Sequence, residues 1–350
     1  MPRRHPWPAR TGPDLYAGSV DTNSPAPDLR HVGRSGLVVS VVGLGCNNLG
    51  RTGTATSTPE GAAAVVGAAL DCGITFFDTA DCYGARPGLS EELLGRALSG
   101  HRDEAVIATK FGMDLHGADG PDFGARGSRS YVVRAVEASL RRLGTDHIDL
   151  YQFHTPDPST PIEETLAALD DVVRAGKVRH IGHSNRSGWQ IAQAEYVARE
   201  LGTHRFVSAQ NHYNLIDRRA ELEVLPAAHE FGLGVLPYFP LANGLLTGKY
   251  SRDTEPPSGS RLDVSKRNLL ETAPWDALDG FRDLAQQAGM TPLRLAFSWL
   301  ASHPTIPSVI AGATRPDQVR QNAASVVSLS DDVLARLDEI FPPAQRVALF

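Results

Sequence analysis

The sequence has little of what marks several other classes of protein. Its three cysteines, Cys46, Cys72 and Cys82, lack CxxC spacing, which argues against a zinc site or a thioredoxin-like motif. Their odd number is typical of a reducing cytosol, so we expect a cytoplasmic protein. No apolar run approaches the ~20 residues of a membrane span, and a net charge of -6 argues against a nucleic-acid surface. We therefore expect neither a membrane nor a nucleic-acid partner.

Several catalytic signatures are also missing. There is no HExxH motif and no set of carboxylates at EF-hand spacing, so we predict no bound metal. Gly43 and Gly45 are followed by Asn48 where a Rossmann fingerprint needs its third glycine, which disfavours a doubly wound dinucleotide fold. Glycoside hydrolysis needs a pair of acids, and only Asp78 is clearly placed at the end of a predicted strand.

What the chain contains is a long alternation of strand and helix patterns. Residues 1–28 hold six prolines and little apolar periodicity, so we predict a disordered N-terminal extension there. Two short apolar runs separated by glycines over 29–40 indicate a β-hairpin. Beyond it, apolar runs typical of strands alternate with helical patterns. The predicted strands are 41–45, 75–78, 105–110, 148–154, 178–184, 206–210, 234–238 and 308–311.

This alternation predicts the fold class. Strands that alternate with helices imply a parallel sheet, and eight such units close most naturally as an α/β fold, the (β/α)8 TIM barrel. The barrel domain is predicted over 29–341, with the N-terminal β-hairpin at its start and a C-terminal helix over 331–340. A short C-terminal tail, 342–350, follows it.

Polar residues stand where consecutive predicted strands end. Asp78 ends the second strand and Tyr83 lies in its loop, Lys110 ends the third, and His154 ends the fourth. Singly, each has an ordinary interpretation: a packing aromatic, a structural ion pair or a hydrogen-bonded core histidine. Because the active site of such a barrel lies at the C-terminal ends of its strands, the coincidence of all four favours catalysis.

Elementary electrostatics suggests what these four groups do. A lysine ammonium ~4 Å from a phenol, at an effective dielectric of ~20, favours the phenolate by ~4 kcal/mol, or ~3 pKa units. We therefore expect Lys110 to lower the pKa of Tyr83, with Asp78 as the counter-charge of the lysine. His154 can donate a hydrogen bond to a carbonyl oxygen. The arrangement suits protonation of an alkoxide as hydride arrives at a carbonyl carbon.

At these residues the chain resembles the aldo-keto reductase superfamily. FFDTADCYG, IATK and SLRRLGTDHIDLYQFH look like the family's signatures, they occur in the family's order, and the resemblance covers 29–322. It implies a barrel that binds NADP(H) without a Rossmann domain and reduces an aldehyde or ketone to an alcohol. It also implies that Asp78, Tyr83, Lys110 and His154 form the catalytic set, with Tyr83 as proton donor.

The resemblance further implies a set of cofactor-binding residues. Ser184, Asn185 and Gln210 match the trio that holds the nicotinamide carboxamide, and Tyr238 matches the stacking aromatic. Phe239 stands where the family usually has serine, which leaves backbone contacts to phosphate. The full set is Gly45, Cys46, Asn47, Asp78, Ser184, Asn185, Gln210, Tyr238, Phe239, Leu241, Asn243, Gly244, Lys249, Gly312, Thr314, Arg315, Gln318, Gln321 and Asn322.

The sequence leaves the substrate and the assembly open. Two long polar stretches, 112–129 and 242–269, are expected to cap the mouth of the barrel. Asn47, His154, Trp275 and Met113 are candidate substrate contacts. The partner is expected to be a small carbonyl or alcohol, and a homo-oligomer is left open. Two rivals remain: a nicotinamide-sensing regulatory subunit with weak turnover, and an unrelated barrel such as a hydrolase or lyase.

Overall fold

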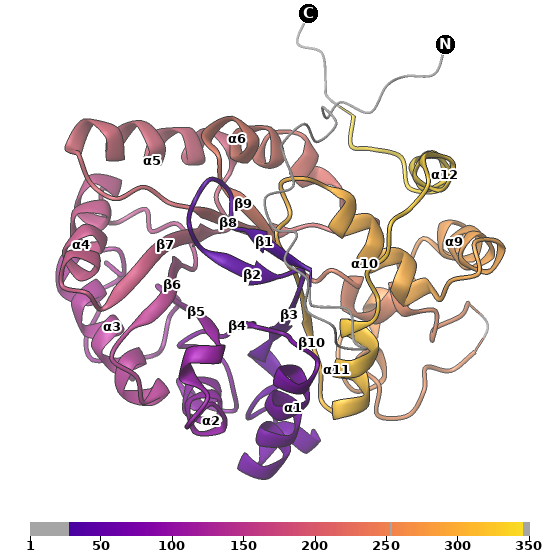
Figure 1. The fold of residues 1–350 in the computed structure, drawn as a ribbon, viewed down its shortest axis with the longest axis horizontal. Helices are drawn as coiled ribbons and strands as arrows, with labels where there is room; N and C mark the ends of the chain where they lie inside the picture. The colour runs from indigo at the N-terminus through magenta and orange to yellow at the C-terminus, as the bar shows by residue number, and fades with distance from the viewer. Residues whose placement is uncertain (1–27, 253, 346–350) are drawn as a thin grey trace, which may run out of the picture.

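Eight parallel strands form one sheet at the centre of a computed structural model that describes residues 28–252 and 254–345 (Figure 1). They pair in the order β10–β3–β4–β5–β6–β7–β8–β9. Their bounds are β3 Val42–Gly45, β4 Phe76–Asp78, β5 Val106–Phe111, β6 Ile148–Phe153, β7 Val178–Ser184, β8 Ser208–His212, β9 Gly234–Tyr238 and β10 Val309–Gly312. Beside β9, the chain that leads into β10 is also paired, because the Val235 amide donates to the Thr305 carbonyl oxygen at 2.7 Å. The sheet is therefore a nearly closed barrel, and the predicted TIM-barrel fold is confirmed.

Helices surround the barrel (Figure 1). They are α1 Pro59–Asp71, α2 Leu89–Ala97, α3 Arg129–Leu143, α4 Ile162–Arg174, α5 Gly188–Leu201, α6 Val224–Phe231, α7 Arg261–Val264, α8 Asn268–Glu271, α9 Trp275–Gln287, α10 Pro292–Ser302, α11 Pro316–Ala323 and α12 Asp331–Ile340. Helix α1 begins as its sequence predicts, because the Thr58 side chain accepts the Gly61 N–H and Pro59 takes the first helical position. Helix α12 is the predicted C-terminal helix.

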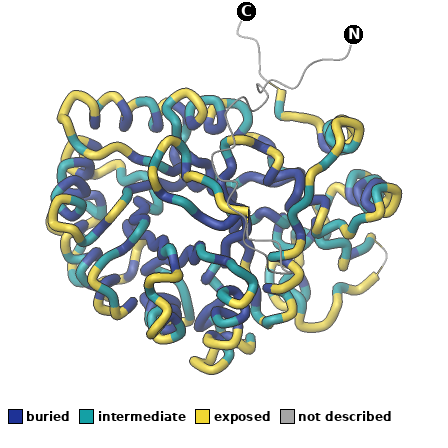
Figure 2. Tube along the Cα trace, viewed as in Figure 1, coloured by how far each residue is buried: buried dark blue, intermediate teal, exposed yellow. Residues whose placement is uncertain are grey.

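The strands divide the core into two layers, and buried residues follow the strands and the inner sides of the helices (Figure 2). Inside the barrel lie Phe76, Ala108, Leu150, Leu236 and Ile310. Side chains on one face of a strand recur every second residue, so Asp78, Lys110 and Gln152 follow this inner layer towards the C-terminal end. The apolar barrel interior thus gives way to polar groups at that end.

The hairpin of β1 (Leu29–His31) and β2 (Val38–Ser40) packs against the inner layer. Its Val32, Leu37 and Val39 belong to the same buried cluster as the barrel interior. Gly33 has a φ of 59°, and a Cβ there would lie 2.2 Å from the carbonyl oxygen of Gly232, so only glycine fits. The hairpin lies across the strands in Figure 1 and plugs the N-terminal end of the barrel, which leaves the opposite end for a site.

Some element bounds differ from the predictions for identifiable reasons. The apolar pattern over 219–230 is typical of a single helix, but a 3-10 turn, Arg219–Glu221, precedes α6 there, and Pro226 falls within the first turn of α6, where proline is tolerated. The predicted strand 206–210 is shifted to β8. The polar stretch 242–269 contains a 3-10 segment, Ala242–Thr247, as well as α7 and α8. The predicted extension, 1–28, lies outside the described residues apart from Asp28, and the predicted tail is described only to residue 345.

Candidate active site

Asp78, Tyr83, Lys110 and His154, here called the tetrad, meet at the C-terminal end of neighbouring strands. Lys110 is fully buried, and its Nζ donates to Asp78 Oδ2 at 2.6 Å, to the Thr79 carbonyl oxygen at 2.7 Å and to Tyr83 Oη at 3.4 Å. An ammonium has three donors, so each has a partner. Burial is the largest single effect and lowers the pKa of Lys110, but Asp78 and Tyr83 together outweigh it, so the pKa is raised. The lysine is therefore charged at neutral pH.

The second oxygen of Asp78 is held by two amides. Asp78 Oδ1 accepts from Gln152 Nε2 at 3.1 Å and from Gln210 Nε2 at 2.9 Å. The carboxylate thus joins side chains from β4, β5, β6 and β8, which fixes its position and satisfies a buried charge. Gln152 was not predicted. Its signal in the sequence is a polar residue inside an apolar strand, two residues before His154 and therefore on the same face.

His154 lies directly beyond β6, where its amide donates to the Phe111 carbonyl oxygen at 2.8 Å. Its ring stands edge-on to the Tyr83 ring, with centroids 5.9 Å apart. Burial, and after it the Lys110 charge, lowers the pKa of His154 to about 3. The imidazole is therefore neutral at physiological pH, and one of its nitrogens carries a hydrogen that can be donated.

The expected direction of the Tyr83 pKa shift is wrong. Burial raises the pKa of Tyr83 to about 12, because loss of hydration outweighs the opposing effect of Lys110. The sequence argument counted the lysine charge but could not count the burial of the phenol. The structure therefore holds Tyr83 as a protonated phenol at neutral pH, which is the form that a proton donor needs.

The trio predicted to hold a carboxamide is brought together beside the tetrad. Ser184 Oγ donates to the Gln210 carbonyl oxygen at 2.7 Å, and Asn185 Nδ2 donates to the His154 carbonyl oxygen at 2.9 Å. Tyr238 Oη donates to Asn185 Oδ1 at 2.9 Å. The ends of β6, β7, β8 and β9 therefore contribute to one polar surface. Its amide and hydroxyl groups are those that an amide ligand such as nicotinamide requires.

The loop after β9 has backbone geometry suited to an anion. Phe239, Ala242, Asn243 and Gly244 all have positive φ, at 53°, 47°, 59° and 102°. Successive residues in right- and left-handed conformations turn several N–H groups toward one concavity, which binds phosphate in other proteins. Positive φ is also costly for non-glycine residues, so three in one loop indicate a functional constraint.

Three cations surround this loop, and the sequence analysis missed all of them. The Arg261 guanidinium lies 5.6 Å and the Lys266 ammonium 4.7 Å from the centre of the Phe239 ring. Burial, followed by the neighbouring cations, lowers the pKa of both Arg261 and Lys266, and Arg51 is among those neighbours. Among the described residues, no carboxylate forms an ion pair with any of the three. A diphosphate would supply the missing negative charge.

Comparison with known proteins identifies the chain. A model of the Aldo/keto reductase family matches residues 41–341. The chain belongs to the aldo/keto reductase family. This aldo/keto reductase is 38% identical over 322 residues to an uncharacterized oxidoreductase, YrpG, of Bacillus subtilis, which covers 89% of this chain and 95% of that protein. Nicotinamide cofactors are typical of the family. The trio and the loop 239–244 with its three surrounding cations, here called the cationic loop, have the groups that such a cofactor requires.

Two further relatives differ in what their names describe. L-glyceraldehyde 3-phosphate reductase of Escherichia coli (strain K12) is 33% identical over 323 residues, or 89% of this chain and 91% of that protein. A probable voltage-gated potassium channel subunit beta of Arabidopsis thaliana is 36% identical over 307 residues, or 85% and 90%. Membership of the family and the oxidoreductase names of the Bacillus subtilis and Escherichia coli relatives support the conclusion that this chain is an oxidoreductase. Within the described residues, no helix of this aldo/keto reductase combines the length and apolar character needed to cross a membrane.

The predicted adenosine side of the site lies at the start of α11. Thr314 donates from its amide to Gln318 Oε1 at 2.8 Å. Arg315 is paired with Asp317, with Nε 3.1 Å from Oδ1, so the cation expected for a 2′-phosphate already has a counter-ion in this aldo/keto reductase. Gln321 is exposed and Asn322 is buried on the same helix. A phosphate would have to compete with Asp317 for Arg315.

Of the other residues predicted at the cofactor or the substrate, some lie near the loop after β3 and others lie in helices or in the loop after β5. Gly45 and Asn47 lie beside Gly312, since a Cβ on Gly312 would sit 3.3 Å from Asn47 Oδ1. Cys46 is fully buried, so a direct contact between its side chain and a ligand is not supported. Trp275 begins α9 and donates from Nε1 to the carbonyl oxygen of Leu270 in α8, so its polar atom already has a partner within the protein. Met113 is exposed in the loop after β5.

Other residues expected at the cofactor lie near the cationic loop. Lys249 stands close to Gly244, where a Cβ would be 3.2 Å from its Cε, and Leu241 precedes the 3-10 segment. A cavity of about 480 Å³ is lined by Asn243 together with Ala242 and Leu245 of this segment, and by Pro342 and Ala344. Residues beyond α12 thus border the cationic loop.

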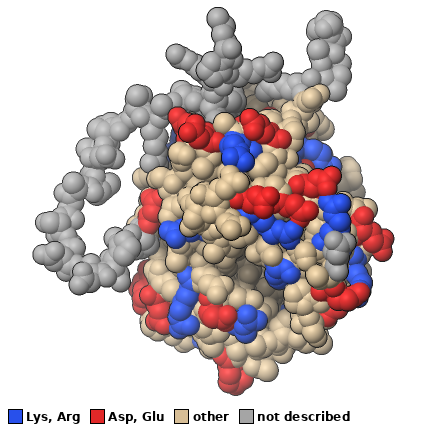
Figure 3. Space-filling view, turned by 90° about the vertical axis from the view of Figure 1, so that its right-hand side faces the viewer, with Lys and Arg blue, Asp and Glu red and all other residues tan. Residues whose placement is uncertain are grey.

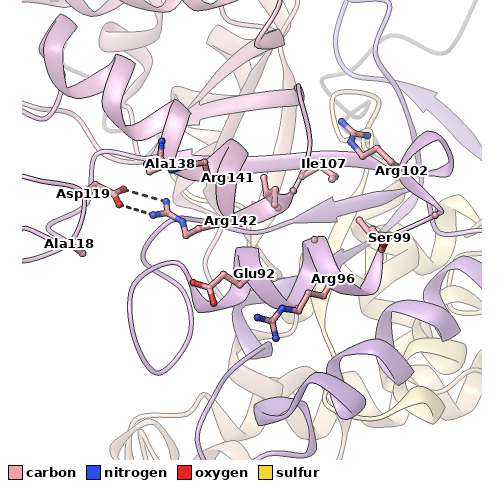
Figure 4. Close-up of a pocket in the computed structure, with 15 residues that line it drawn as sticks. Glu92, Arg96, Ser99, Arg102, Ile107, Ala118, Asp119, Ala138, Arg141 and Arg142 are labelled. Carbon is pink, nitrogen blue, oxygen red and sulfur yellow. Dashed lines mark hydrogen bonds and ion pairs between the residues drawn. The ribbon is translucent and has the colours of Figure 1, made fainter.

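A larger cavity, of about 960 Å³, lies elsewhere (Figure 4). It opens between α2 and α3 and is crossed by the pair Arg142–Asp119, and Arg96 and Arg141 also line it. No tetrad residue lines this cavity, so cavity size alone does not identify the candidate active site. On the face that Figure 3 shows, positive and negative side chains are interspersed, and no single sign dominates it.

Proposed function

We propose that this aldo/keto reductase is an NADP(H)-dependent enzyme that reduces an aldehyde or ketone to an alcohol, with Tyr83 as proton donor. The observation that carries the proposal is the buried Lys110 ammonium, which links Asp78 to the Tyr83 hydroxyl beside a neutral His154. A carbonyl oxygen that becomes an alkoxide needs both a proton donor and a hydrogen-bond donor, and this arrangement offers both.

Each residue of the tetrad has a separate part in the proposed reaction. A reduced nicotinamide, when bound, supplies hydride to the carbonyl carbon. The Tyr83 hydroxyl donates its proton to the carbonyl oxygen as negative charge develops there. The Lys110 ammonium then stabilises the phenolate by ~4 kcal/mol if the effective dielectric is ~20 at ~4 Å. His154 donates a hydrogen bond to the same oxygen, and Asp78 keeps the lysine charged and in place.

The residues that would hold the cofactor follow from their chemistry. Ser184, Asn185 and Gln210 offer donors and acceptors for the carboxamide, with Tyr238 beside them. The loop from Phe239 to Gly244, with Arg51, Arg261 and Lys266 around it, offers charge for the diphosphate. The start of α11, a helix N-terminus with Arg315 before it, suits the 2′-phosphate of NADP(H).

A direct test compares both nicotinamides. NADPH is expected to quench the protein fluorescence at lower concentration than NADH, and NADPH oxidation is expected with members of a panel of aldehydes, ketones, sugars and pyridoxal. Absence of quenching by either nucleotide would refute the cofactor assignment and would favour an unrelated barrel chemistry. We also propose a cytoplasmic location and a small carbonyl or alcohol as the partner. Light scattering would measure whether the protein forms a homo-oligomer.

A second candidate is a nicotinamide-sensing subunit of a larger assembly. The resemblance to a channel subunit beta favours it, since that relative covers 85% of this chain. The two candidates differ in a measurable way. A sensing subunit would retain NADPH tightly, would oxidise it with no member of the panel, and would bring a stable partner through affinity purification. If the protein reduces any of these carbonyls at a rate comparable to that of other reductases, the result favours the carbonyl reductase over the sensing subunit.

A further inference from the structure

A second group of reactive side chains shares His154 with the tetrad, and its other two members, Asp81 and Cys82, have no part in the proposed reaction. Asp81, Cys82 and His154 each offer one ligand atom, and these three atoms all lie within 4.8 Å of one another. Cys82 Sγ is 3.8 Å from His154 Nδ1. The group combines a carboxylate, a thiol and an imidazole, which are the ligand types of protein zinc sites.

Asp81 is the unusual member of the group. It is fully buried, and both of its carboxylate oxygens lack a hydrogen-bond partner within the described residues. Burial of an unpartnered carboxylate is costly, and such a group in a folded protein calls for an explanation, such as a catalytic role or an ion. The proposed reaction does not use this carboxylate. A cation bound at Asp81 would supply the partner that its oxygens lack.

One distance within the group matches that of a tetrahedral metal site. With a Zn–S bond of about 2.3 Å and a Zn–N bond of about 2.05 Å, tetrahedral ligands lie about 3.6 Å apart, and the observed Sγ–Nδ1 distance is 3.8 Å. The backbone already holds the ligands: the Asp81 amide donates to the Lys110 carbonyl oxygen at 3.1 Å, and the Asp81 carbonyl oxygen accepts from Gly88 at 2.6 Å. The distances to the Asp81 carboxylate are at most 4.8 Å, so that side chain would have to move closer to the other two to close the site.

We propose that Asp81, Cys82 and His154 bind one zinc ion, with a fourth position open to water. Three protein ligands with one open position is the arrangement of many non-structural zinc sites. A thiolate, an imidazole and a carboxylate favour zinc over magnesium or calcium, which prefer oxygen ligands alone. The site would tie the loop that carries Tyr83 to the end of β6.

Zinc binding has a consequence for turnover that rests on the proposed function. A metal on Nδ1 fixes the His154 ring and places a divalent charge next to Tyr83, so the carbonyl can no longer be oriented as the reaction requires. We therefore expect zinc to inhibit NADPH-dependent reduction. The inhibition would be relieved by a chelator, because the metal is not part of the resting enzyme.

The binding test does not depend on activity. Cobalt(II), a spectroscopic substitute for zinc, is added to the full-length protein, and its thiolate-to-metal absorption band and tetrahedral band are recorded. One equivalent should give both bands, and zinc should abolish them. Cys82→Ala should remove the thiolate band, and Asp81→Asn should weaken zinc binding at least ~10-fold in calorimetry, since even groups behind metal ligands cost that much. Circular dichroism verifies that each variant is folded.

Cys72→Ala is the matched control, since Cys72 lies at the end of α1, outside this group. The control should keep both bands and full zinc affinity. A wild-type protein without a thiolate band, or a band that disappears in Cys72→Ala and stays in Cys82→Ala, would overturn the proposal whatever the variants' stability. In assays, Cys82→Ala should lose zinc inhibition relative to its own zinc-free rate. If no variant or wild type turns over, the proposed function fails while the binding result stands.

Discussion

Replacement of Lys110 by methionine removes one partner of a buried ion pair. In the wild type the Lys110 and Asp78 side chains are 0% and 6% exposed, with 2.6 Å between Nζ and Oδ2. Methionine fills a similar volume but leaves the carboxylate buried without its cation. Loss of one partner from such a pair costs about 3–5 kcal/mol. Gln152 and Gln210 still donate to the other oxygen, so we expect a value near 3 kcal/mol.

A double-mutant cycle tests this reasoning. Asp78→Asn keeps an oxygen that can accept from both glutamines and removes the negative charge. We expect the double variant Lys110→Met/Asp78→Asn to be more stable than Lys110→Met alone by ~2 kcal/mol, although all three variants should be nearly inactive. Urea unfolding followed by circular dichroism measures each free energy of unfolding. A cost below ~1 kcal/mol for Lys110→Met, or additive effects in the double variant, would show that the pair does not stabilise the site.

Three further outcomes are expected. Since burial raises the pKa of Tyr83 to about 12, the tyrosinate absorbance of wild type minus Tyr83→Phe should show no ionisation below pH ~10, and ionisation there would contradict the protonated phenol. Gly33→Ala should lower the free energy of unfolding by at least ~2 kcal/mol, while Gly36→Ala in the same hairpin, with nothing within 4 Å of its Cβ, should change it little; equal effects would contradict the close approach. Arg261→Ala should weaken NADPH binding at least ~10-fold, and it should not lower the stability of the cofactor-free protein, because it removes a cation that lies beside other cations. Arg141→Ala, at an exposed arginine, is the control, and an equal loss of NADPH affinity in that variant would refute a local role of Arg261.

The fold and the tetrad could be predicted because both depend on short-range patterns. Alternation of strands and helices is visible in the sequence, and parallel strands end at one face, so Asp78, Lys110 and His154 had to lie close together. The same reasoning could have found Gln152, since it occupies the inner face of β6 two residues before His154. Gln152 could not be told from a structural residue, because an amide does not titrate and carries no catalytic signature of its own.

Other features depend on packing that a sequence does not display. The raised pKa of Tyr83 comes from burial, which a charge-based argument leaves out. Arg261 and Lys266 lie in a polar stretch without periodicity, and only the folded loop brings them to Phe239. The pairing of Arg315 with Asp317 involves neighbours in the sequence, but whether two exposed side chains meet depends on backbone geometry at the start of α11.

The central claim, that Tyr83 donates the proton, is tested most directly by single-turnover reduction with Tyr83→Phe. The variant is mixed with saturating NADPH and a carbonyl that the wild type reduces, and oxidation of the bound nucleotide is followed in time. NADPH should bind with unchanged affinity, because Tyr83 is not among the residues assigned to the cofactor. The rate should fall at least ~100-fold, the lower range of general acid catalysis. A variant that binds NADPH normally and turns over at the wild-type rate would contradict the account.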